Sequence, residues 1–413
     1  MFIDSDDIKK VIPEVVKIRR HIHMYPEISE QEYETSKYIK KCLEEIGLEA
    51  KIIGDTGVVS MLMNNPEYPT VGLRAEMDAL PIEEETNLEF KSKNKGVMHA
   101  CSHDGIVATA LGVTRLLYEH KDELKCNVKF IFEPAEEVGK GAKKLIAEKV
   151  LEDPKVDKMV IFHYANSEPI GMEIQKSVST ATLGRVGIEI IGKSSHWGEP
   201  EKGINAISVS AKVIDAIDKI NIDLKEKMQF VLGMGTINGG VKNNIMAENV
   251  KLEGTIRTFC EENLEYVLTY LQDRMKEIEE ETKATIKATL TSHLPALINN
   301  PDLVKMGSKV GKEVFGDKFV LGEKPFLAGD NAAYYFRLVP GVRMVFFAEK
   351  EIHVPVEIQL RTIAMDFWAS LEHTIRYKKN LPINAEIETE LKECADSSRE
   401  WDGKMEHLLH ILT

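Results

Sequence analysis

Apolar and polar positions along the chain follow two periods, and each change of period marks a new element. Residues 126–132 place Val128, Phe130 and Phe132 at every second position, which predicts a strand. Residues 262–281 instead repeat apolar side chains three and four positions apart, which is typical of an amphipathic helix. The chain therefore contains both kinds of element.

Short strands alternate with helices over the first 180 residues. The pattern predicts helices within residues 7–47, interrupted at Pro26, and over 104–120 and 140–149, and strands over 71–77, 126–132 and 159–162. Such alternation indicates βαβ units and a largely parallel sheet. Ligands bind beyond the carboxyl ends of the strands in sheets of this kind.

The rhythm changes between residues 182 and 291. Strands are expected over 185–191, 230–237, 249–259 and 284–290, with helices over 204–220 and 262–281. This β-α-β-β-α-β order is the ferredoxin-like split motif. The fold prediction is an α/β protein: a discontinuous α/β domain of residues 1–181 and 292–413 with a mostly parallel central sheet, and an inserted ferredoxin-like α+β domain of residues 182–291.

Charge and composition exclude several classes of protein. The 413 residues include 53 Lys and Arg against 67 Asp and Glu, a net charge of −14, which argues against a nucleic-acid partner. No apolar run reaches the length that spans a bilayer, and the first ten residues lack the pattern of a signal peptide. We therefore expect a cytoplasmic protein that does not bind membranes. Five widely spaced cysteines without a CxxC motif argue against a disulfide framework.

Two short motifs carry candidate chemistry. His99-Ala-Cys101-Ser-His103-Asp-Gly combines thiolate and imidazole, the ligand types of zinc and its neighbours; a buried cysteine beside surface histidines is the alternative. Pro134-Ala-Glu136-Glu137 follows a predicted strand, so one carboxylate can bind a metal while the other faces a substrate water. Two solvated glutamates at a helix N-terminus are the alternative.

Three further histidines stand alone in their surroundings. His163 ends the predicted strand 159–162, His353 precedes Val354-Pro355 in a loop, and His196 lies in the inserted domain. By itself, each is more simply a core or surface residue than a ligand.

Taken in order, these motifs resemble peptidase family M20, the binuclear metallopeptidases of the aminoacylase and carboxypeptidase type. The nearest resemblance is to its amidohydrolase branch of hippurate, auxin-conjugate and N-acyl-amino-acid hydrolases. The resemblance runs from about residue 19 to 369. Its motifs are RRHIHMYPE at 19–27, RAEMDALP at 74–81, HACSHDG at 99–105, PAEE at 134–137, His163, Gly239-Gly240 with Asn244, and GTIRTF at 254–259.

The resemblance implies a binuclear metal site and a catalytic base. The metal ligands would be Cys101, His103, Glu137, His163 and His353, with Cys101 where other members bridge the metals through a carboxylate. They would hold two divalent ions, Zn²⁺ or Mn²⁺, with Co²⁺ or Ni²⁺ as further options. Glu136 would be the general base that deprotonates the metal-held water and then protonates the leaving amine.

The resemblance also gives the inserted domain a function as a lid. His196 and Asn244 match lid positions that reach the oxyanion or carboxylate of the substrate, and the lid histidine comes from the partner subunit in the family. Arg257 matches an arginine that can pair with a substrate carboxylate. We therefore expect a homodimer formed through the lid domain.

Several positions around the motifs depart from the family pattern. Ser102 stands where glycine is usual, Ile106 where histidine is usual, Asp330-Asn331 where Glu-Asp is usual, and Val354 where serine is usual. The residues after about 380 lie outside the pattern altogether. Retained ligands with an altered surrounding pocket indicate retained chemistry on a changed substrate.

The resulting hypothesis is an amidohydrolase that removes the acyl group of a small N-acyl or N-aroyl amino acid. A dipeptidase or carboxypeptidase on the same scaffold is the first alternative. A metal-binding homologue without hydrolysis is the second, although retention of Glu136 and all five ligands argues against it. A ferredoxin-like nucleic-acid module is the third, and the acidic charge disfavours it.

Overall fold

Eight strands form the larger sheet of the computed structural model, which describes residues 5–165 and 170–347. Their order is β1-β2-β4-β3-β5-β14-β6-β13. The central strands β4, β3, β5 and β14 are parallel to their neighbours in this run, and β13 is parallel to β6. The pairs β1–β2, β2–β4 and β14–β6 are antiparallel. The mixed α/β fold with a large, mostly parallel sheet is therefore as predicted.

The helices α1–α4 and the strands β3, β4 and β5 lie close to their predicted positions, whereas the other elements around this sheet had no predicted bounds. The strands are β1 (Ala50–Ile53), β2 (Gly57–Leu62), β3 (Thr70–Glu76), β4 (Asn127–Glu133), β5 (Lys158–Ala165), β6 (Gly171–Gln175), β13 (Phe319–Gly322) and β14 (Gly341–Phe347). The helices are α1 (Ser5–Met24), α2 (Tyr33–Ile46), α3 (His103–Glu119), α4 (Gly141–Ala147), α7 (Pro301–Phe315) and α8 (Ala333–Phe336). A small two-stranded sheet joins β7 (Val178–Thr180) to β12 (Leu297–Ile298).

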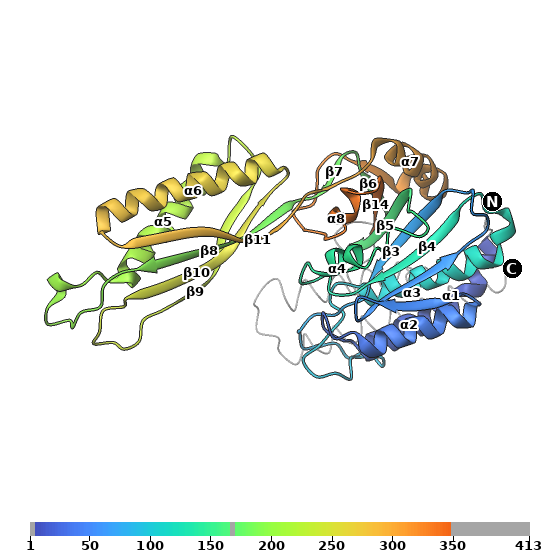
Figure 1. The fold of residues 1–413 in the computed structure, drawn as a ribbon, viewed down its shortest axis with the longest axis horizontal. Helices are drawn as coiled ribbons and strands as arrows, with labels where there is room; N and C mark the ends of the chain where they lie inside the picture. Colours follow the sequence, from blue (N-terminus) through green and yellow to red (C-terminus); the bar gives the residue numbers. More distant parts are fainter. Residues whose placement is uncertain (1–4, 166–169, 348–413) are drawn as a thin grey trace, which may run out of the picture. The chain divides into compact units, whose positions relative to one another are not determined.

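Helix α3 is held tightly where it meets α1. The two helices pack together, and α3 also contacts α2 and β3 (Figure 1). A Cβ at Gly112 would lie 2.5 Å from a methyl carbon of Val15, so glycine permits this close approach. A second group of buried side chains, including Ile131, Leu145 and Tyr335, packs β4 against α4 and α8. The N-terminal end of α3 is therefore fixed relative to the central strands.

Residues 182–294 build a separate antiparallel sheet. Its strands are β8 (Thr182–Ile191), β9 (Val231–Gly239), β10 (Asn249–Thr258) and β11 (Thr285–Leu294), and its helices are α5 (Ala206–Leu224) and α6 (Glu261–Thr282). The order β11-β8-β10-β9, with helices after the first and third strands, is that of the ferredoxin-like split motif. This sheet and its helices share their own apolar core.

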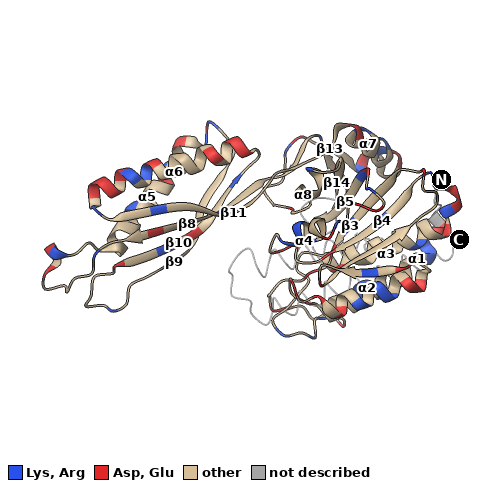
Figure 2. Cartoon of the chain, viewed as in Figure 1, with Lys and Arg blue, Asp and Glu red and all other residues tan. Residues whose placement is uncertain are grey.

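Amphipathic patterning explains how the two helices of residues 182–294 are placed. Leu264, Val267 and Leu271 of α6 are buried against the sheet, whereas Figure 2 shows charged residues along the rest of this helix. Asn205 caps the N-terminus of helix α5, because its side chain accepts a hydrogen bond from the main-chain N–H of Ile207. The assignment of residues 348–413 to the larger domain concerns a segment outside the described residues.

Candidate metal centre

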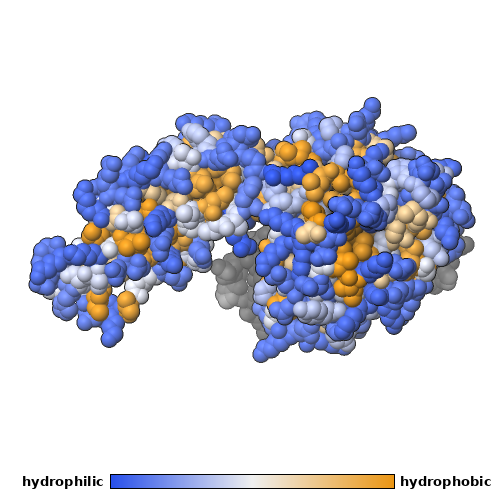
Figure 3. Space-filling model, in the orientation of Figure 1, coloured by the Kyte–Doolittle hydropathy of each residue, from blue (hydrophilic) through white to orange (hydrophobic). Residues whose placement is uncertain are grey.

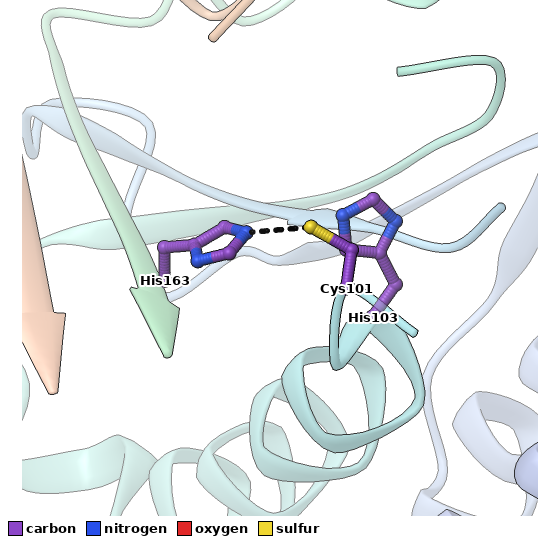
Figure 4. A group of neighbouring side chains, drawn as sticks. All are labelled: Cys101, His103 and His163. Carbon is purple, nitrogen blue, oxygen red and sulfur yellow. Dashed lines mark hydrogen bonds between the residues drawn. The ribbon is translucent and has the colours of Figure 1, made fainter. Parts of the chain in front are cut away.

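Three side chains with metal-binding atoms meet at the carboxyl ends of the central strands. Cys101 lies in the turn before α3, His103 is the first residue of α3, and His163 lies on β5, two residues before the strand ends. One ligand atom from each lies within 4.8 Å of the others. Figure 4 shows the Cys101 sulfur between the two rings, 3.6 Å from Nε2 of His163.

Both imidazole rings are oriented by main-chain carbonyl groups. Nδ1 of His103 lies 2.8 Å from the carbonyl oxygen of Asp78, and Nδ1 of His163 lies 2.7 Å from that of Tyr164. In each neutral ring the proton therefore resides on Nδ1, and Nε2 presents a lone pair to the site. Metal-binding histidines are commonly oriented in this way.

A second group joins His103 to the two adjacent glutamates. Ligand atoms of His103, Glu136 and Glu137 also lie within 4.8 Å of one another. Nε2 of His103 and Oε1 of Glu137 are 3.9 Å apart, and both are buried without a hydrogen-bond partner among the described residues. Ligands in a tetrahedral zinc site, with bonds of about 2.0 Å, lie about 3.3 Å apart. A divalent cation therefore fits between these two atoms after a small adjustment.

Glu32 fixes the turn that carries the two glutamates through a hydrogen bond to its main chain. Ala135 adopts a left-handed backbone conformation, with φ of 53°, which redirects the chain after β4. Its main-chain N–H donates to Oε1 of Glu32, at 2.7 Å, and Oε2 of Glu32 accepts from Thr56. This turn brings Glu136 and Glu137 to the strand ends.

Asp78 links both groups, although it is not one of the predicted ligand or catalytic residues. Its Oδ2 accepts hydrogen bonds from the main-chain N–H of Glu137, at 3.0 Å, and from the hydroxyl of Ser29. Its carbonyl oxygen orients His103. The position of Asp78 two residues after β3, within the RAEMDALP motif, was the available sequence signal.

For His103, burial lowers the pKa, but its contact with Asp78 raises the pKa well above its ordinary value. Burial governs the protonation of His163 and Glu136. It lowers the pKa of His163 to about 3, and the nearby Arg343 guanidinium acts in the same direction. Burial, followed by the negative charge of Asp330, raises the pKa of Glu136 well above its ordinary value. A neutral imidazole is a ligand, and a carboxylate with a raised pKa is a stronger base, so both shifts suit the predicted functions.

The remaining predicted site residues lie elsewhere. His196 and Asn244 are exposed on the ferredoxin-like domain, and Nδ1 of His196 accepts a hydrogen bond from the main-chain N–H of Gly198. Arg257 on β10 donates from Nη1 to the carbonyl oxygen of Leu327, at 2.8 Å. In the described part of the chain, no hydrogen bond joins these three to Cys101, His103 or His163. His353 lies outside the described residues.

Family comparison agrees with this geometry. Residues 72–358, more than half of the chain, match the model of peptidase family M20/M25/M40. The chain belongs to this family. A second, shorter match covers residues 336–381 and corresponds to a region found in RelA / SpoT proteins. The two matches overlap over residues 336–358, which include His353.

Relatives in the M20 family include a deacetylase and a carboxypeptidase. An N-acetyl-L-cysteine deacetylase of Bacillus subtilis is 35% identical over 79% of both chains. Thermostable carboxypeptidase 1 of Saccharolobus solfataricus is 34% identical over 82% of this chain and 86% of its own. A Bacillus subtilis structure, described as a dinuclear metal binding peptidase of the M20 family, superposes with a TM-score of 0.72 at 28% identity, over 89% of this chain and 99% of its own.

Family membership supports a hydrolase that uses divalent metals. The donor atoms around His103 are of the corresponding types. Among the described helices, none combines the length and apolar character needed to cross a bilayer.

Proposed function

We propose that this M20 hydrolase cleaves the amide bond of N-acyl or N-aroyl amino acids. The observation that carries this proposal is the position of Glu136, a half-buried carboxylate close to Nε2 of His103 and Oε1 of Glu137, which have no hydrogen-bond partner among the described residues. The deacetylase relative supports this substrate class.

Cys101, His103, Glu137 and His163 are the described residues that would hold divalent ions. When bound, these ions would lower the pKa of a water molecule and polarise the scissile carbonyl. Zinc suits a set of one thiolate and two imidazoles, and Mn²⁺ is the alternative. The protein contributes the orientation of both rings through the carbonyls of Asp78 and Tyr164.

Glu136 would move the protons of the reaction. Its carboxylate takes a proton from the attacking water and then gives it to the departing amine nitrogen. The raised pKa makes this carboxylate a stronger base than an ordinary glutamate. Glu137 would instead be a metal ligand, because its Oε1 lies 3.9 Å from Nε2 of His103.

The fifth ligand in this proposal is His353. Two family matches overlap at this residue, so the M20 alignment alone does not distinguish a ligand from a residue of the RelA/SpoT-like segment. The variant His353→Ala decides the matter. Loss of one of two bound ions, measured by elemental analysis, supports the ligand assignment, whereas unchanged metal content contradicts it.

The ferredoxin-like domain would contribute to substrate binding and to assembly. Arg257 would pair with the substrate carboxylate, and His196 and Asn244 would reach its polar atoms, with His196 acting across a homodimer. Strand β9 lies at an edge of its sheet, and exposed edges are usually paired or covered. Exposed apolar residues on and beside this edge include Ile207, Ile237 and Val241, and Figure 3 shows apolar patches on this part of the chain.

A carboxypeptidase or dipeptidase activity is the second candidate, favoured by the carboxypeptidase relative. An assay on both classes of substrate distinguishes the deacylase from the peptidase. Purified protein supplied with Mn²⁺ or Zn²⁺ would be assayed on N-acetyl-L-cysteine, N-benzoylglycine, N-blocked dipeptides and free dipeptides, with Glu136→Gln as the inactive control. Preference for the first two supports the deacylase, and preference for either peptide class supports the alternative. No hydrolysis of any substrate with either metal would contradict both.

A further inference from the structure

Asn331 connects the proposed base to a buried arginine. It lies in the loop between β13 and α8 and is fully buried. Its main-chain N–H points to Oε1 of Glu136 at 3.4 Å, and its side-chain Oδ1 accepts from Nη2 of Arg74 at 2.7 Å. The first distance is long for a hydrogen bond, as catalytic contacts often are before substrate binds.

Arg74 is itself immobilised on the central strand β3. Its side chain is fully buried and forms ion pairs with Glu133 at 2.9 Å and Glu76 at 2.8 Å. A third carboxylate, Asp330, lies 3.5 Å from Nη1 of Arg74. A planar guanidinium with several partners has a fixed orientation, so Nη2 is a firm anchor for Asn331.

The residue before Asn331 is fixed as well. Oδ2 of Asp330 pairs with Nε of Arg343 at 3.1 Å, and its Oδ1 accepts from the main-chain N–H of Ala332 at 3.0 Å. The loop of residues 330–332 is thereby attached to β3 through Arg74 and to β14 through Arg343. This is the position at which the sequence departs from the usual Glu-Asp of the family.

We propose that Asn331 is a positioning residue for Glu136, and that Arg74 holds Asn331 in place. The inference rests on the proposed function of Glu136 as the base. A carboxylate held through one oxygen keeps the other available for a proton, and a base works only when it lies within hydrogen-bond reach of the proton it takes. Neither Asn331 nor Arg74 contacts the substrate in this account.

The test combines Asn331→Ala with Glu136→Gln in a double-mutant cycle. Asn331→Ala removes the acceptor of Arg74, so kcat for N-acetyl-L-cysteine should fall by about tenfold or more, with KM within about twofold and metal content unchanged. In the Glu136→Gln background the same change should have no further effect. Asn331→Ser removes the same contact, because its hydroxyl is too short to reach Arg74, and it serves if the alanine variant does not fold.

The matched control is Asn127→Ala. Asn127 is equally buried and hydrogen-bonded, but it lies at the opposite end of β4, so its loss should leave kcat unchanged. An equal fall in kcat with and without the Glu136 carboxylate would overturn the positioning proposal, and so would loss of metal in Asn331→Ala. If Glu136→Gln alone left the rate unchanged, the proposed function would fail instead.

Discussion

The sulfur of Cys101 lies 3.6 Å from Nε2 of His163, although 62 residues separate them in sequence. Because Nδ1 of His163 faces the carbonyl of Tyr164, the thiol is the donor in this contact. A thiol that donates to an imidazole has a proton that a metal ion can displace, and the two atoms would then become ligands of the same ion.

Removing this thiol should therefore weaken metal binding. Cys101→Ala is expected to raise the dissociation constant for Zn²⁺ more than tenfold, because it removes a ligand that lies between the two histidines. Cys126→Ala is the matched control, since Cys126 is also a half-buried free cysteine but lies directly before β4, at the strand end opposite to Glu136. Zinc titration against a competing chelator measures both variants, and equal affinities would rule out Cys101 as a ligand.

The two neighbouring glutamates should differ in what their loss affects. Glu136→Gln should lower kcat by about 10² to 10⁴ while both metals stay bound, because the amide keeps the shape of the side chain but cannot accept the proton. Glu137→Gln should instead lower metal content, because it removes a ligand charge that faces His103. Elemental analysis and steady-state kinetics on both variants test the assignment, and the reverse outcome would exchange the two roles.

Ser102 is a candidate for a stabilising substitution. It lies between Cys101 and His103 with φ of 64° and ψ of 20°, a left-handed conformation that costs most residues about 1–2 kcal/mol. Glycine relieves this strain, although its greater entropy in the unfolded state offsets part of the gain. Ser102→Gly should therefore raise the free energy of unfolding by about 0.5–1 kcal/mol, without loss of activity. Urea denaturation measures the gain. Ser102→Ala, which keeps the Cβ, should show none.

His23 should give the fold a pH-dependent contribution. It is buried, with Nδ1 2.8 Å from Oδ2 of Asp104, which also pairs with Arg19. Burial alone would lower the pKa of His23, but the hydrogen bond and charge of Asp104 raise it above its ordinary value. A raised folded-state pKa adds stability that is complete below about pH 6.5 and is lost as pH rises through the folded-state value.

The variant His23→Gln isolates this contribution. It should lower the free energy of unfolding by about 2 kcal/mol at pH 6 and by less at pH 9. Urea denaturation at several pH values gives the difference, with His196→Gln at an exposed position of the ferredoxin-like domain as control. A difference that grew with pH would mean that His23 is neutral in the folded protein.

Assembly can be tested at the free edge of the ferredoxin-like sheet. Val241, next to the end of β9, is 85% exposed. If a homodimer forms there, Val241→Lys should convert the dimer to a monomer in light scattering, because it places a charge in an apolar contact. Val314→Lys changes an exposed valine of α7 and should leave the mass unchanged. A wild-type chain that is an active monomer would contradict the dimer.

The sequence predicted which side chains would gather at the sheet edge because each lies in a short local pattern. Cys101 and His103 share one turn, Glu136 and Glu137 follow a strand with strict alternation, and His163 lies on a continuous apolar run. The carboxyl ends of neighbouring parallel strands meet at one edge, so local placement predicts that these residues gather there, whereas their assignment as ligands came from the family resemblance. Whether these residues bind metal stays a prediction.

The contacts that hold the site residues in place, such as that between Asn331 and Arg74, could not be predicted in the same way. Asn331 and Arg74 are 257 residues apart, and no periodicity links a polar loop residue to an arginine within an apolar strand. The antiparallel strands β1 and β2 were also not predicted. Strand β1 has only four residues, with two exposed and one half-buried, so it carries too few positions to establish a period.

The first and last strands of the ferredoxin-like domain, which connect it to the rest of the chain, pair with each other. Leu183 at the start of β8 stands opposite Leu294 at the end of β11 in the antiparallel register. The two attachment points are therefore neighbours. An insertion of more than a hundred residues thus needs the same short distance between its ends as a tight loop would. Such a segment is an exchangeable cassette: evolution or an engineer could replace it while strand β5 and helix α3, which carry His163 and His103, stay intact.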